Sequence, residues 1–81
     1  MNDATRWALD MVLVRVEKMH QQSAHLDREA KSKWFTNHVA AWHFQHRGQP
    51  DTVEDVADAA AFSIFSLQYA YNGGQPYRLV S

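Results

Sequence analysis

The sequence predicts an all-α fold: a three-helix bundle-like domain with a long first helix and a short extended C-terminal tail. Glycine and proline, the residues that most often interrupt helices, occur only within Gly48–Pro50 and Gly73–Pro76. Residues 1–47 contain neither, and their apolar residues recur at spacings of three and four, which place side chains on one helix face. No segment reads convincingly as a β-strand.

The first helix is expected to begin at Asp3 or Thr5, because either side chain can act as an N-cap. Its apolar residues then follow a heptad-like spacing, which favours packing against another helix. We interpret this stripe as a self-association seam, with the aromatic second helix as the alternative surface, and expect a homo-oligomer, most simply a dimer. The seam residues are Leu9, Val12, Val16 and Met19.

The first helix is expected to end well before the first glycine. A single helix reaching Arg47 would be about 65 Å long, and the rest of an 81-residue chain could not cover it. We therefore predict a break between Gln21 and Ser32. Ser23, Asp27 and Ser32 are the candidate N-caps of the next helix.

The second and third helices are separated by the first glycine–proline segment. The second is predicted to end near His46, with Gly48 in the left-handed conformation that closes many helices. Asp51 is expected to cap the third helix, and Glu54, three residues later, completes a capping-box pattern. The third helix should then run to about Asn72.

Composition limits the function classes. The 81 residues form one domain, and eight Lys and Arg against nine Asp and Glu give a net charge of −1, which disfavours a general polyanion binder. The absence of cysteine excludes disulfides, iron–sulfur clusters and a cysteine nucleophile. The apolar stretch 59–71 is shorter than the ~20 residues of a membrane span, and the N-terminal residues do not form a signal peptide. We therefore expect a cytoplasmic protein without membrane contact.

The histidines raise the question of a metal site. His43 and His46 lie three residues apart on one helix, a spacing that can hold a metal ion. A third ligand would have to be Glu54, Asp55 or Asp58. Histidines on a tryptophan-rich helix more often serve packing or interfaces, so we predict no metal and no cofactor.

The acidic residues at the start of the predicted third helix resemble a motif of a known protein family. Residues Glu54–Phe62 weakly resemble the second half-motif of MazG-type nucleotide pyrophosphohydrolases, in which Glu and Asp on an alanine-rich helix hold Mg²⁺ for a nucleoside triphosphate. The resemblance covers about ten residues, and it implies Glu54 and Asp58 as magnesium ligands. The family's Glu-Glu-x-x-Glu element is missing from the preceding helix. Helix capping explains the same acidic residues without a metal.

The second helix carries the candidate binding surface. No acidic residue occurs between Ala30 and Pro50, and cations alternate there with aromatic side chains. Phe44 lies about 200° around the helix from Trp42, so part of this aromatic surface must lie outside a three-helix core. Exposed aromatics beside arginine are typical of protein interfaces. The predicted partner-binding residues are Lys31, Lys33, Trp34, His38, Trp42, His43, Phe44, His46 and Arg47.

These observations favour a small non-catalytic protein that binds and covers a site on another macromolecule, preferably a protein. In size and helical build it is similar to short phage-encoded inhibitors of host defence, including anti-CRISPR proteins. A nucleotide-binding or nucleotide-sequestering module is the alternative, with a tryptophan, Trp34 or Trp42, stacking on the base. Its phosphate-binding residues would be Lys31, Lys33, His38, His43 and Arg47. A degenerate MazG-like enzyme is the third hypothesis.

Overall fold

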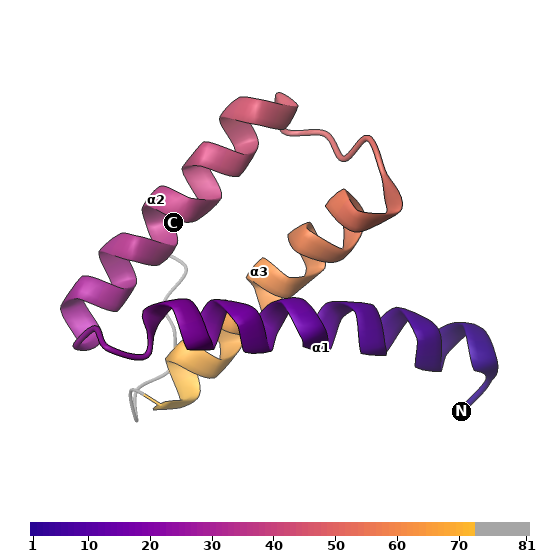
Figure 1. The fold of residues 1–81 in the computed structure, drawn as a ribbon, viewed down its shortest axis with the longest axis horizontal. Coiled ribbons are helices and arrows are strands. Elements are labelled where there is room, and N and C mark those ends of the chain that lie inside the picture. Colours follow the sequence, from indigo (N-terminus) through magenta and orange to yellow (C-terminus); the bar gives the residue numbers. More distant parts are fainter. Residues whose placement is uncertain (73–81) are drawn as a thin grey trace.

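The all-α prediction is confirmed. The computed structural model describes residues 1–72, which contain no strand and form three helices of similar length (Figure 1). These are α1 (Asp3–Ser23), α2 (Arg28–His46) and α3 (Val53–Asn72). The break between the first two helices falls inside the predicted interval. The predicted extended tail lies outside the described residues.

The caps of α1 and α2 explain where these helices begin. The cap of α1 is Asn2, whose Oδ1 accepts from the Thr5 backbone N–H at 2.8 Å, so the prediction of Asp3 or Thr5 was wrong. The reason is that Asn2 is extended, and the carboxylate of Asp3 instead lies in the first turn, at the positive end of the helix dipole. The cap of α2 is Asp27, one of the predicted candidates, which accepts from the Ala30 N–H at 2.8 Å.

The predicted end of α2 near His46 is confirmed, but the first left-handed residue lies one position earlier than predicted. Arg47, not Gly48, is the first left-handed residue, with φ 53°, and Gly48 follows with φ 75°. The Gly48 N–H donates to the His43 carbonyl at 3.1 Å, as in a Schellman motif. The glycine therefore occupies the position after the left-handed cap.

The start of α3 is shifted in the same way. The Thr52 Oγ1 accepts from the Asp55 N–H at 3.1 Å, and the Asp55 carboxylate accepts from the Thr52 N–H at 3.2 Å. The predicted pair Asp51 and Glu54 was therefore wrong, because the reciprocal capping bonds form one residue later. The shift leaves Glu54 exposed.

The core lies where α1 crosses α3. Val16 and Met19 of α1 are buried against Ala61 and Phe65 of α3, and Phe65 is only 1% exposed. The small side chain of Ala61 allows the two helices to approach closely. The aromatic side chains of α2 complete this core, with the Phe35 ring stacked on Phe65 at a centroid distance of 4.8 Å.

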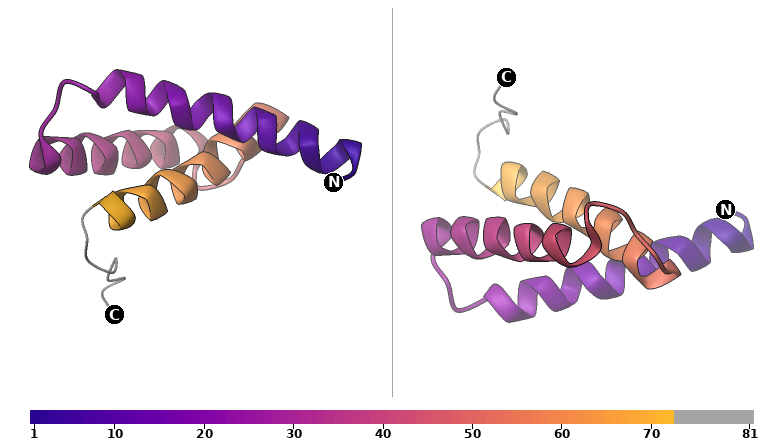
Figure 2. Two further views of the ribbon diagram at one scale, coloured as in Figure 1. Left: turned by 90° about the horizontal axis from the view of Figure 1, so that it is seen from below. Right: turned by 90° about the horizontal axis from the view of Figure 1, so that it is seen from above.

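The N-terminal half of α1 projects beyond the other two helices in the views of Figure 2. Every residue from 1 to 10 is exposed. No helix among the described residues has the length and apolar character needed to cross a membrane. The bundle thus leaves half of its first helix uncovered by the described part of the chain.

Candidate functional site

The inner face of α2 packs its aromatic side chains against the core formed by α1 and α3. The predicted binding residues on this face are Trp34, His38, Trp42 and His46. Trp42 is buried at 8% exposure and meets the Phe62 ring of α3 edge-on, at a centroid distance of 5.7 Å. Trp34 stacks on His38 at 4.9 Å and packs against the core. Four of the nine predicted partner-binding residues therefore lie on the face that packs within the chain.

The outer face of α2 points away from the core. We define it by its exposed side chains, Lys33, Asn37, Ala40, His43, Phe44 and Arg47. Phe44 is 88% exposed, the most exposed large apolar side chain of the described residues. Four predicted binding residues meet here, whereas Lys31 is half-buried. An exposed phenyl ring on the same face as an arginine suits a protein interface.

Arg47 is the unpaired permanent charge of the outer face among the described residues. Lys33 forms one ion pair, with Glu29 at 3.6 Å, but both side chains are largely exposed and such pairs contribute little. This charge pattern complements an acidic surface.

Arg47 also adopts an unfavourable backbone conformation. Its φ of 53° is the one positive φ among the described non-glycine residues. The left-handed conformation costs a residue with a side chain roughly 1 kcal/mol relative to glycine. Strained residues of this kind cluster at binding sites, and Arg47 lies at the end of the outer face.

A groove of about 570 Å³ separates α1 from α2, with α3 as its floor. This volume is in the range of small-molecule sites. Its lining residues are Val14, Arg15, Lys18, Met19, Gln22, His38, Ala41, Trp42, Gln45, His46, Asp58, Ala61 and Phe62. The Arg15 Nε lies 2.9 Å from Asp58 Oδ1, so the charge of this arginine is neutralised. The Lys18 side chain supplies the remaining cation of the wall.

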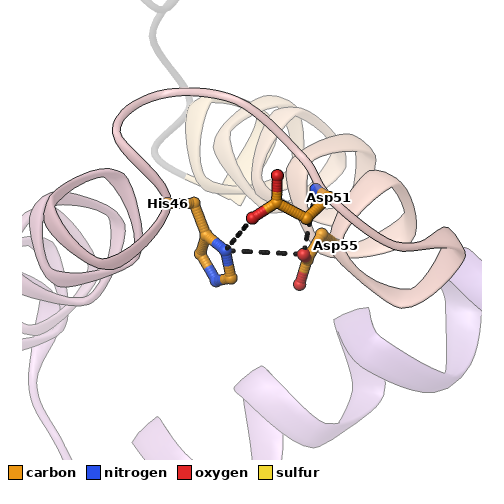
Figure 3. A group of neighbouring side chains, drawn as sticks. All are labelled: His46, Asp51 and Asp55. Carbon is orange, nitrogen blue, oxygen red and sulfur yellow. Dashed lines mark hydrogen bonds and ion pairs between the residues drawn. The ribbon is translucent and has the colours of Figure 1, made fainter.

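His46 connects the end of α2 to the start of α3 (Figure 3). Its Nδ1 lies 3.4 Å from Asp55 Oδ2 and 3.9 Å from Asp51 Oδ2. Partial burial acts to raise the pKa of Asp55, but the N–H groups of Asp51 and Thr52, the charge of His46 and the Thr52 hydroxyl outweigh it. The pKa of Asp55 is therefore below its ordinary value.

The same three side chains are the described group whose geometry could hold a metal ion. The predicted set is only partly assembled, because Asp55 joins His46 but His43 is not in the group. Asp55 Oδ2 already accepts two backbone N–H bonds, at 3.1 and 3.2 Å. The positive end of a helix dipole favours anions over cations, so the arrangement is better explained as a link between helices.

The acidic residues of the MazG resemblance do not form part of a metal-binding group among the described residues. Asp58 lies in the groove and pairs with Arg15, while Glu54 is exposed. No acidic side chain of α1 completes a cluster with them among the described residues. The geometry therefore does not assemble a magnesium site from these residues.

The predicted self-association seam is divided between the core and the surface. Val16 and Met19 are buried against α3 of the same chain, and Val12 packs on that core. Leu9 is 44% exposed. Trp7 and Val14, on another side of α1, are exposed.

Comparisons of the chain with protein-family models, with curated proteins and with solved structures find no match. No relative therefore supplies a function by similarity. The basic outer face of α2 and the groove beside it are the features on which a functional proposal can be based.

Proposed function

We propose that this chain is a non-catalytic binding protein whose α2 outer face covers an acidic, partly apolar site on another protein. The observation that carries the proposal is Phe44, an aromatic side chain of α2 that is 88% exposed. Burying a phenylalanine side chain contributes roughly 1.5–3 kcal/mol. An isolated domain gains nothing from leaving this ring in water.

The surroundings of Phe44 support a protein partner over a small ligand. Lys33, His43 and Arg47 share this exposed face with Phe44 and Ala40, and Lys33 lies about three helical turns from Phe44. A convex helix face with one aromatic anchor and a polar rim matches the anatomy of binding hot spots. The cations should speed association with an acidic partner and make it sensitive to salt.

Occlusion of the partner's own site is the simplest way for so small a domain to act. The proposed mode of action is the one used by short phage-encoded inhibitors of host defence, including anti-CRISPR proteins. Such occlusion requires only affinity for the partner's site and a shape that fits it. The small size of the domain and the surface around the exposed Phe44 support this mode of action.

Comparative affinity capture tests the proposal. Immobilised wild-type chain, Phe44→Ala and Leu67→Ala are exposed to the same host extract, and bound proteins are identified by mass spectrometry. Leu67 is the matched control, since it is an apolar side chain with 67% exposure on α3. The partner should be retained by Leu67→Ala and lost by Phe44→Ala. Equal retention by both variants would refute the assignment of this face.

A nucleotide-binding role for the α1–α2 groove is the second candidate. The groove's volume of about 570 Å³ favours it, as does Lys18, which forms no ion pair among the described residues. Of the predicted phosphate-binding residues, only His38 lines the groove. Titration with ATP, GTP and cyclic nucleotides should quench tryptophan fluorescence, and Lys18→Gln should weaken the binding. Absence of quenching across this panel would eliminate the candidate.

A further inference from the structure

A second apolar stripe runs along α1, away from the core. Trp7, Met11 and Val14 follow the spacing of four and three that defines a heptad seam, and Lys18 continues it. Trp7 is 57% exposed and Val14 is 63% exposed. The core-facing residues of the same helix, Val16 and Met19, point to a different side. This stripe, which we call the α1 stripe, is exposed at Trp7 and Val14 and half-buried at Met11.

The α1 stripe leads directly into the α1–α2 groove. Val14 and Lys18 belong to both, and on the α2 side the groove wall continues with Ala41 and Trp42. The apolar surface is therefore continuous from the projecting N-terminal half of α1 into the groove. Exposed apolar patches of this kind mark interaction sites.

The charges along α1 fit a second copy of the same helix running in the opposite direction. Asp3 and Arg6 lie near its start, whereas Glu17 and Lys18 lie toward its end. A twofold axis between Asp10 and Met11 would place Asp3 opposite the partner's Lys18. The same axis would place Arg6 near the partner's Glu17.

We propose that two copies of this chain associate through antiparallel packing of their α1 stripes. In this arrangement Trp7 lies opposite the partner's Val14, at the mouth of the partner's α1–α2 groove. The symmetry is that of an isologous dimer, in which each contact occurs twice. The lysine at a seam position specifies register, as single polar seam residues do in coiled coils.

The dimer leaves the outer face of α2 free and does not depend on the proposed function. Phe44 belongs to a different surface from Trp7 and Val14. A dimer would present two outer faces to its target. A variant that abolishes dimerisation should therefore retain Phe44-dependent capture, so the two proposals can fail separately.

Sedimentation equilibrium of the purified chain over a range of concentrations tests the dimer. Val14→Glu should weaken association at least about tenfold, the scale of losing one well-packed anchor. Leu13→Glu is the matched control, because Leu13 is 48% exposed on the same helix but lies outside the α1 stripe. Trp7→Ala, in the projecting end of α1, provides a second variant that leaves the core intact.

Charge exchange tests the register. Asp3→Lys and Lys18→Asp should each weaken the dimer, and the double variant should restore it. The proposed axis also brings Asp10 close to the partner's Asp10, so Asp10→Asn should tighten the association. A chain that stays monomeric up to about 1 mM, equal effects of Val14→Glu and Leu13→Glu, or no rescue by the double charge exchange would each overturn the proposal.

Discussion

The two faces of α2 carry similar residues, but the inner face packs against the core and the outer face is exposed. Trp42 and Phe44 are two positions apart, yet the first is 8% exposed and the second 88% exposed. The difference arises because the Phe62 side chain of α3 contacts one face only. Aromatic content alone therefore does not distinguish a core from a binding surface, whereas the position of the neighbouring helix does.

The largest expected contrast is between Trp42→Ala and Phe44→Ala. Truncation of a buried tryptophan removes about 3 kcal/mol or more from the free energy of unfolding. Truncation of an exposed phenylalanine should change it by less than about 0.5 kcal/mol. Urea denaturation followed by circular dichroism measures both. Similar values for the two variants would contradict the assignment of inner and outer faces.

The capping box at the start of α3 should have the next largest effect. Thr52→Ala removes the acceptor of the Asp55 N–H and should lower the free energy of unfolding by about 1 kcal/mol. Thr36→Ala is the control, since Thr36 is exposed in the middle of α2. Alanine has the higher helix propensity, so this control should be neutral or slightly stabilising. If Thr36→Ala lowered the free energy of unfolding as much as Thr52→Ala does, the effect at Thr52 could not be attributed to helix capping.

Substitution of Arg47 tests whether the outer face of α2 supports binding at the expense of the stability of the fold. Arg47→Gly relieves the left-handed conformation at φ 53° and should raise the free energy of unfolding by roughly 0.5–1 kcal/mol. The same variant removes a cation from the outer face and should weaken partner binding. Arg47→Ala removes the cation but retains the strain. It should therefore weaken binding without the gain in stability.

The smallest expected effect is a pH dependence at the junction of the two helices. Because the pKa of Asp55 is lowered by folding, its carboxylate stabilises the fold above its ordinary pKa of 3.8, and this stabilisation disappears as the pH falls through the lowered value. The free energy of unfolding should therefore fall less steeply below pH 4 in Asp55→Asn than in the wild type. Asp51→Asn, whose side chain is largely exposed, should follow the wild type. If the free energy of unfolding had the same pH dependence in all three proteins, this role of Asp55 would be contradicted.

The sequence predicts the helices well, because glycine, proline and polar caps act locally. The break before α2 and the cap at Asp27 follow from side chains that bond to their own neighbours. The errors at Asn2, Arg47 and Thr52 are shifts of one to three residues, which local propensity does not resolve. The first and last residues of a helix depend on backbone torsion angles. Near each predicted boundary, several neighbouring residues could act as the cap.

The candidate site is harder to predict, because a helix stripe does not specify what covers it. Val16 and Met19 form a good seam by spacing, but Phe65 of the same chain covers them. Helical periodicity separates Trp42 from Phe44 but does not say which of them faces α3. Signals for the α1 stripe were present in the spacing of Trp7, Met11 and Val14. Only the crossing of α1 and α3 shows that this stripe stays outside the core.

The most direct test of the central claim measures the affinity of the captured partner for the wild type, Phe44→Ala and Leu67→Ala. Circular dichroism first establishes that all three are equally folded. Loss of the anchor at Phe44 should weaken binding at least about tenfold, whereas Leu67→Ala should bind as the wild type does. Equal affinities of Phe44→Ala and the wild type would show that the outer face of α2 is not the binding surface.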